Sequence, residues 1–265
     1  MGPLSLQPSE ITKYMIVMYM AKSLEFKGEK IKTFAYGIIP YLLVSGFYAG
    51  LVFAEKNLSI AAVIMIVTLI VLYVAGGART KHISLVMLMV ILAGVAGIVF
   101  EPFRVKRFLS FLNPWEDSKG TGYQLIQSLL ALGSGGIWGG VGIGRSRQKC
   151  YYIPEPHNDF IFAIIGEELG LIGCIFIVIL FSIFIWRGIV IATKAKDTYG
   201  TILATGITSI VAVQAIINMA VVTGSMPVTG VPLPFISYGG SSLAINLMAM
   251  GGILLNISRQ SENSV

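Results

Sequence analysis

The feature that most constrains this chain is a series of apolar runs, each about as long as a helix that crosses the hydrocarbon layer of a bilayer. We predict about seven transmembrane helices, at residues 10–26, 35–54, 58–76, 82–100, 160–187, 198–223 and 237–257. Only 12% of the 265 residues are charged, against roughly 25% in soluble domains. We therefore expect an all-α polytopic membrane protein that forms a single integral membrane domain over residues 1–265.

Basic residues predict which way the spans face. With strictly alternating spans, one set of connections carries ten of them: Lys22, Lys27, Lys30, Lys32, Arg79, Lys81, Arg187, Lys194, Lys196 and Arg259. The short connections 55–57 and 224–236 carry only Lys56. Because short cytoplasmic loops are rich in Lys and Arg, we expect the first set inside, together with the C-terminus. The long loop 101–159 then faces outside.

The long loop is predicted to contain structure of its own. Asn113, Pro114 and Trp115 indicate a turn with an aromatic anchor. The segment 122–132, "GYQLIQSLLAL", has apolar residues at helical spacing and predicts a short helix in the interface plane. Seven glycines within 133–144 could bring backbone close to a phosphate, although a plain surface loop explains them as well.

Seven basic residues of this loop leave two interpretations open. They are Arg104, Lys106, Arg107, Lys119, Arg145, Arg147 and Lys149. Such residues commonly touch anionic lipid headgroups. They would equally suit a phosphate-bearing ligand, because arginine presents a planar fork of donors that matches phosphate oxygens.

One acid stands where the loop meets the next span. Asp159 follows the rigid segment 154–156, "PEP", and precedes the apolar run. It is a candidate catalytic carboxylate, although an aspartate at a helix start is also an ordinary N-cap. Glu116 and Asp117 lie in a turn and suit capping, whereas the adjacent glutamates 167 and 168 lie inside the next span, where charged groups indicate function.

Polar groups inside the other spans also allow two interpretations. Glu10 and Lys13 are three residues apart on one helix face. They form either an exposed ion pair of little consequence or part of a site in a cavity between helices. Gln214, Asn218 and Asn246 lie mid-span and either pack between helices or line a path. With two histidines in the chain and no HExxH motif, we expect no zinc site.

Four stretches together resemble a known family. They are "QPSEITK", "FLNPWEDSKGTGYQLIQSLLALGSGGIWGGVGIGRSRQK", "YYIPEPHNDFIFAIIGEELGLIG" and "GVPLPFISYGGSSL". They resemble the SEDS (shape, elongation, division and sporulation) membrane glycosyltransferases, and more the branch of FtsW and its sporulation paralogue than that of RodA. Family members have ten spans, and this chain matches the last seven, so three upstream spans are expected to be absent from it. "EKNLS" and Asn158 depart from the usual pattern.

The resemblance implies an activity and a site. It implies a peptidoglycan glycosyltransferase that polymerises lipid II at the outer face of the cytoplasmic membrane, in cell division or sporulation. Asp159 would be the general base. The implied substrate-binding residues are Glu10, Lys13, Arg104, Arg107, Ser146, Gln148, Lys149, His157 and Glu168.

The resemblance also implies partners. Lipid II would be the substrate, and a class B penicillin-binding protein and other divisome or spore-cortex membrane proteins would be protein partners, with no nucleic acid. A divalent cation, Mg²⁺ or Mn²⁺, could help to neutralise the leaving pyrophosphate, although no ligand cluster is evident. A lipid II flippase and a non-catalytic scaffold are the alternative functions.

Overall fold

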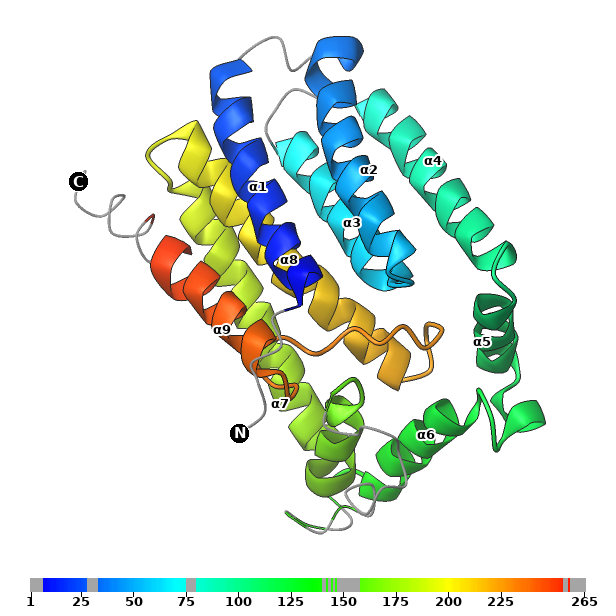
Figure 1. Ribbon diagram of the computed structural model, residues 1–265. Helices are drawn as coiled ribbons and strands as arrows, with labels where there is room; N and C mark the ends of the chain where they lie inside the picture. The colour runs from blue at the N-terminus through cyan, green and yellow to red at the C-terminus, as the bar shows by residue number, and fades with distance from the viewer. Residues whose placement is uncertain are drawn as a thin grey trace. The chain divides into compact units, whose positions relative to one another are not determined.

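The computed structural model of the protein describes residues 7–27, 33–74, 80–139, 142, 144, 146, 158–254 and 257. Throughout those ranges the regular elements are helices, and no strand occurs (Figure 1). In chain order they are α1 (Pro8–Lys27), η2 (Phe34–Ile38), α2 (Ile39–Ala54), α3 (Leu58–Val74), α4 (Thr80–Val99), α5 (Pro102–Leu112), η3 (Pro114–Asp117), α6 (Tyr123–Gly135), α7 (Ile161–Thr193), α8 (Thr198–Val222), α9 (Gly240–Met248) and η5 (Ala249–Leu254).

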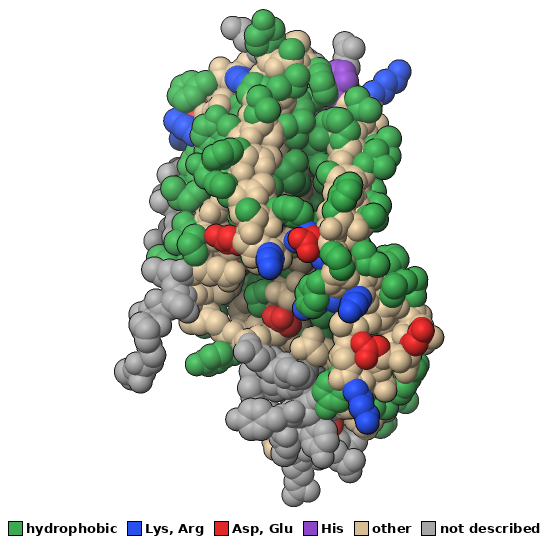
Figure 2. All heavy atoms as spheres, turned by 45° about the vertical axis from the view of Figure 1, so that its right-hand side comes forward, with side chains coloured by type: hydrophobic (Ala, Val, Ile, Leu, Met, Phe, Trp, Pro, Cys, Tyr) green, Lys and Arg blue, Asp and Glu red, His purple; other side chains and the backbone are tan. Residues whose placement is uncertain are grey.

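Four helical segments are long and apolar enough to cross a membrane. They are Phe34–Ala54, Lys81–Val99, Ile161–Thr193 and Thr198–Val222, and α3 is a shorter apolar helix. Large hydrophobic side chains stay exposed along α4, among them Leu85, Leu88 and Leu92, and hydrophobic side chains cover much of the helical surface in Figure 2. Such a surface suits contact with lipid. The prediction of an all-α polytopic membrane protein is confirmed, whereas the number of seven spans and their sidedness stay predictions.

The chain folds into two compact units, each built from segments that are distant in the sequence. The first unit comprises Met1–Val95, Phe184–Val213 and Gly240–Val265. The second comprises Ala96–Ile183 and Gln214–Gly239. The helices α7 and α8 each contribute residues to both units.

In the first unit, α2 and α3 pack as an antiparallel pair that α1 contacts (Figure 1). A tight turn at residues 55–57 joins α2 to α3. Lys56 adopts a positive φ of 63°, and the Asn57 side-chain oxygen accepts the backbone N–H of Ile60 at 3.1 Å, which caps the start of α3. The predicted separation of these two spans at 55–57 is confirmed.

The second unit contains the helices of the long loop. The predicted turn at Pro114 is a short 3-10 helix, and the predicted helix at 122–132 is α6. We did not predict α5, which starts with Pro102 as its first residue, a position where proline needs no backbone N–H. α5 is amphipathic and too short for a span, so a search for long apolar runs does not find it.

The long helix α7 differs from the prediction of one continuous span at 160–187. It extends to Thr193 and is interrupted at Gly170, whose φ of 67° and ψ of −163° are not helical. The break frees backbone donors, and two of them find new acceptors: Leu171 N–H bonds to Gly136 O at 2.9 Å and Ile172 N–H to Ile137 O at 3.3 Å. A broken helix at membrane depth is tolerated when neighbouring protein satisfies the freed groups.

Candidate active site

Asp159 lies in a turn directly before α7, as the sequence predicts. Its side chain is half-buried, and the next residue, Phe160, is fully buried. The anchored phenylalanine fixes the start of the apolar helix while the carboxylate keeps access to the outside of the protein. Asp159 therefore combines a fixed backbone with an accessible acidic group, which a general base requires.

The backbone around Asp159 is held by two polar side chains from the second unit. Asn218 Nδ2, from α8, donates to the main-chain oxygens of Asp159 and Val231, each at 2.8 Å. Ser237 Oγ donates to the main-chain oxygen of Asn158 and accepts the N–H of Leu233 at 2.8 Å. The turn before α7 is thus tied to the segment that follows α8.

Gly230 lies directly against the Asp159 carboxylate. A Cβ atom built on Gly230 would stand 3.2 Å from Asp159 Oδ2, and Gly230 has a positive φ of 71°. Glycine is the residue that adopts this conformation without steric strain. The carboxylate therefore rests beside bare backbone, and a larger residue at this position would push on it.

Two arginines of α5 have different roles in the structure. The charges of Arg107 and Asp159 interact. Burial lowers the pKa of Arg107, and the negative charge of Asp159 opposes that shift. Its guanidinium lies 4.5 Å from the centre of the Phe103 ring. Arg104 Nη1 instead donates to Gly97 O at 2.8 Å, at the end of α4. Arg107 is thus a predicted ligand-binding residue whose charge interacts with that of Asp159.

Ser146 joins the two glutamates of α7. Its hydroxyl donates to Glu167, which is 2% exposed, and its backbone N–H donates to Glu168 Oε1 at 3.2 Å. These carboxylates lie just before the break at Gly170 and accept hydrogen bonds from the long loop. Ser146 and Glu168 therefore have a structural role in the loop, and a substrate-binding role for them stays a prediction.

Three other predicted substrate-binding residues lie outside the described residues: Gln148, Lys149 and His157. Nothing further follows for them from the structure.

Glu10 and Lys13 form a buried ion pair in the first unit. The Nζ and Oε1 atoms are 2.9 Å apart. Ser242, on α9, donates to Glu10 Oε2 at 3.0 Å, and Tyr14 donates to Asn246. The interpretation as an exposed pair is wrong, because both side chains are removed from solvent and connected to α9. A cavity of about 10 Å³ beside Lys13 is close to the minimum for one water molecule.

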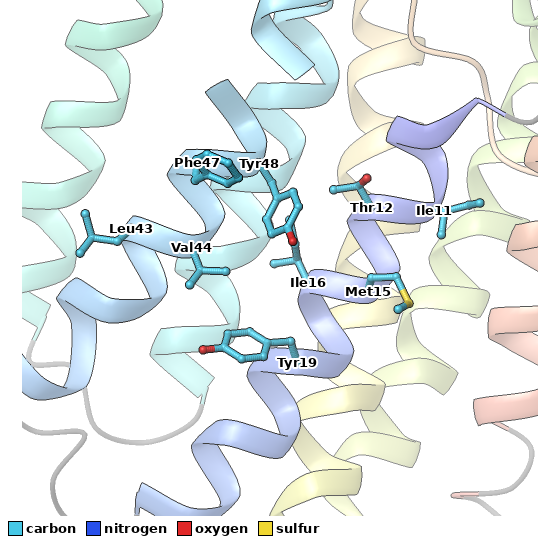
Figure 3. Close-up of a pocket in the computed structure, with 9 residues that line it drawn as sticks. All are labelled: Ile11, Thr12, Met15, Ile16, Tyr19, Leu43, Val44, Phe47 and Tyr48. Atoms are coloured by element: carbon cyan, nitrogen blue, oxygen red, sulfur yellow. The ribbon is translucent and has the colours of Figure 1, made fainter. Parts of the chain in front are cut away.

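An apolar groove of about 730 Å³ runs between α1 and α2. Figure 3 shows Ile16 and Tyr19 of α1 on the side that faces Val44 and Phe47 of α2. No charged side chain lines it. Its apolar lining suits hydrocarbon.

The residues that the structure describes include no group of three or more His, Cys, Asp or Glu side chains that could hold a metal ion. A role for Mg²⁺ or Mn²⁺, which often binds through one or two carboxylates and substrate phosphates, stays a prediction.

The mid-span amides of Asn218 and Asn246 have partners that their positions in the sequence do not predict. Both side chains are hydrogen-bonded to protein groups. Asn218 binds the turn before α7 and the segment after α8, whereas Asn246 of α9 binds Tyr14 of α1 as packing between helices predicts. A search for amides inside apolar spans would flag them, but it would not identify their partners.

Comparison with known proteins extends these observations. The cell cycle protein family of FtsW, RodA and SpoVE matches residues 1–263. Stage V sporulation protein E of Bacillus subtilis (strain 168) is 48% identical over 262 residues, which are 98% of this chain and 70% of that protein. A probable peptidoglycan glycosyltransferase FtsW of Geobacter sp. (strain M18) is 44% identical over 253 residues, 95% of this chain and 68% of that protein.

Solved structures show the same likeness. A chain from work on the structural coordination of polymerization and crosslinking by a peptidoglycan synthase complex superposes with a TM-score of 0.78 at 27% identity, covering 98% of this chain and 72% of that one. The rod shape determining protein RodA of Thermus thermophilus superposes with a TM-score of 0.66 at 24% identity, covering 98% and 68%. The second likeness shows the fold alone.

Proposed function

The chain belongs to the cell cycle protein family of FtsW, RodA and SpoVE, and on that premise we propose that it is a peptidoglycan glycosyltransferase with Asp159 as its general base. The observation that carries the proposal is the setting of Asp159. It combines a half-buried carboxylate, a backbone held by Asn218 and the nearby positive charge of Arg107. The family resemblance read from the sequence is confirmed.

The substrate in this proposal is lipid II, a disaccharide peptide linked to undecaprenyl pyrophosphate. Asp159 takes the proton of the acceptor sugar's hydroxyl as that oxygen bonds to the anomeric carbon of the donor sugar. The bond between the anomeric carbon and the phosphate oxygen breaks, and its electron pair leaves with undecaprenyl pyrophosphate. A positioned general base of this kind contributes about 10²- to 10⁴-fold to the rate.

Positive charge is needed where the pyrophosphate leaves. Arg107 is a described loop residue that can supply it, because the charges of Arg107 and Asp159 interact. The buried pair of Glu10 and Lys13 is the second proposed element of substrate binding, in the first unit, since buried charges in membrane proteins mark functional sites by default. No step of the proposal depends on a divalent cation.

The proposal includes a place of action and a partner. The excess of basic residues in the other connections supports an outward-facing long loop, and therefore chemistry at the outer face of the cytoplasmic membrane in division or sporulation. A class B penicillin-binding protein would cross-link the new strands. The similarity to a chain of a peptidoglycan synthase complex that couples polymerization to crosslinking supports such a partner.

The test is the substitution Asp159→Asn in the complete gene product, reconstituted with labelled lipid II. Asparagine caps a helix almost as well as aspartate, but its amide cannot accept the proton. We expect normal expression and thermal stability with polymerisation lowered about 10²- to 10⁴-fold. Asp159→Glu should also fail badly, because one methylene displaces the base.

The matched control is Asp117→Asn. Asp117 is the last residue of η3 and a second acid of the long loop, and its carboxylate accepts the Thr121 N–H at 2.9 Å; because asparagine keeps a side-chain acceptor there, its variant should polymerise normally. Long glycan strands from Asp159→Asn would show that Asp159 is only a cap. Transfer of the labelled monomer across the bilayer without polymer in the wild-type protein would instead support a flippase, and neither product would support a scaffold.

A further inference from the structure

The hydrogen bonds of Asn218 beside Asp159 identify which atom of its side-chain amide is the donor. Its side chain is 1% exposed, and the atom that faces the oxygens of Asp159 and Val231 must be the amide nitrogen, because carbonyl oxygens only accept hydrogen bonds. The two hydrogens of the NH₂ group match these two acceptors. One side chain thus joins the residue that carries the carboxylate to the segment after α8.

Val231, the second residue that Asn218 binds, is also connected to the Asp159 carboxylate. Val231 follows Gly230, which lies against Asp159 Oδ2. By holding Val231 O and Asp159 O together, Asn218 controls the distance between the Asp159 backbone and the surface on which its carboxylate rests. Loss of the amide donors would free both segments to move apart.

Space filling alone does not account for an asparagine at this position. Among the described residues, Asn218 Oδ1 has no hydrogen-bond partner although it is buried. A buried acceptor without a partner is unfavourable, and an apolar residue of similar shape would avoid that penalty. The presence of the amide is therefore explained by what its NH₂ group binds.

We propose that Asn218 is a positioning residue that sets the attack geometry of Asp159 by clamping its main-chain oxygen to that of Val231. This inference rests on the proposed role of Asp159 as general base. Asn218 does not touch the substrate in this proposal. Its removal should therefore slow the chemical step and leave substrate binding intact.

Gln214 provides a matched control. It lies one helical turn before Asn218 on α8, it is also 1% exposed, and its buried side-chain oxygen has no hydrogen-bond partner within the described ranges. Gln214→Leu and Asn218→Leu therefore make the same change, from a buried amide to an apolar residue on one helix. They differ in whether a bond to the Asp159 backbone is lost.

The experiment measures kcat and KM for labelled lipid II, together with thermal stability, on the complete gene product in proteoliposomes. We expect Asn218→Leu to lower kcat about 10- to 100-fold, the effect of misplacing a catalytic group by about 1 Å, with KM within about twofold of that of Gln214→Leu. Asn218→Asp keeps the side-chain shape but lacks the donor, so it should lose kcat equally if the leucine variant does not fold. In an Asp159→Asn background, Asn218→Leu should lower the residual rate no further.

The outcomes separate the inference from the function on which it rests. Equal kcat for Asn218→Leu and Gln214→Leu, with Asp159→Asn inactive, would overturn the positioning role alone. The positioning role would also be overturned if the fall in kcat were fully explained by a smaller fraction of folded protein. Full activity of Asp159→Asn would instead remove the proposed base itself.

Discussion

Lys13 Nζ donates to Glu10 Oε1 at 2.9 Å inside α1, and neither side chain is more than 3% exposed. Burial makes this pair different from an exposed i,i+3 pair, which contributes only tenths of a kcal/mol. Ser242 and Asn246 extend the hydrogen bonding to α9. The pair therefore balances two buried charges in the first unit and also joins α1 to α9.

The first prediction concerns this pair. Glu10→Gln or Lys13→Met alone should each destabilise the protein by about 3–5 kcal/mol, because one buried charge is left without its partner. The double variant should be less destabilised than the sum of the two single variants. Unfolding in detergent micelles measures all four proteins of the cycle, and additive, near-neutral changes would contradict the prediction.

The second prediction separates two arginines of α5. Arg107→Gln should raise KM for lipid II by about 10- to 100-fold, the loss expected for hydrogen bonds to a charged group, and Arg107→Lys should restore only part of it. Arg104→Gln should instead lower thermal stability, since it removes the bond to Gly97 O. Steady-state kinetics and melting curves of the three variants test this, and identical behaviour at both positions would contradict it.

The third prediction concerns the break in α7. Gly170→Ala should destabilise the protein by about 3 kcal/mol or more, since left-handed backbone is strained for alanine and its Cβ would stand 2.3 Å from Gly139 N. The control is Gly133→Ala in α6, where a Cβ meets nothing within 4 Å and alanine should be neutral or slightly stabilising. Equal stability of the two variants would show that the close approach at Gly170 is not required.

The fourth prediction concerns pH. The backbone N–H and hydroxyl of Thr121 hold the pKa of Asp117 below its ordinary value of 3.8. A carboxyl whose pKa is lower in the folded state stabilises the fold above its unfolded pKa, and loses that contribution as pH falls through the folded pKa. Wild type should therefore melt above Asp117→Ala at neutral pH, and the difference should shrink below about pH 3.8. A difference that is constant from pH 6 to pH 3 would contradict this.

The sequence by itself determined where the long apolar helices lie. Apolar runs of about 20 residues form helices in a membrane whatever their neighbours are, because the backbone must satisfy its own hydrogen bonds there. The sequence also predicts the turn at 55–57, α6 and the position of Asp159 before an apolar helix. Short polar segments between apolar runs are local signals of this kind. The four matching motifs identified the family because they too are local stretches of the sequence.

Only the tertiary structure decided which polar groups meet. The first predicted span shows no apolar stripe that marks its buried side, so the burial of Glu10 and Lys13 could not be predicted. The break at Gly170 depends on acceptors supplied by residues 136 and 137, more than thirty positions earlier. Asn218 reaches the backbone of Asp159 across 59 positions. Contacts of this kind depend on which distant segments pack together, and the local pattern of residues does not contain that information.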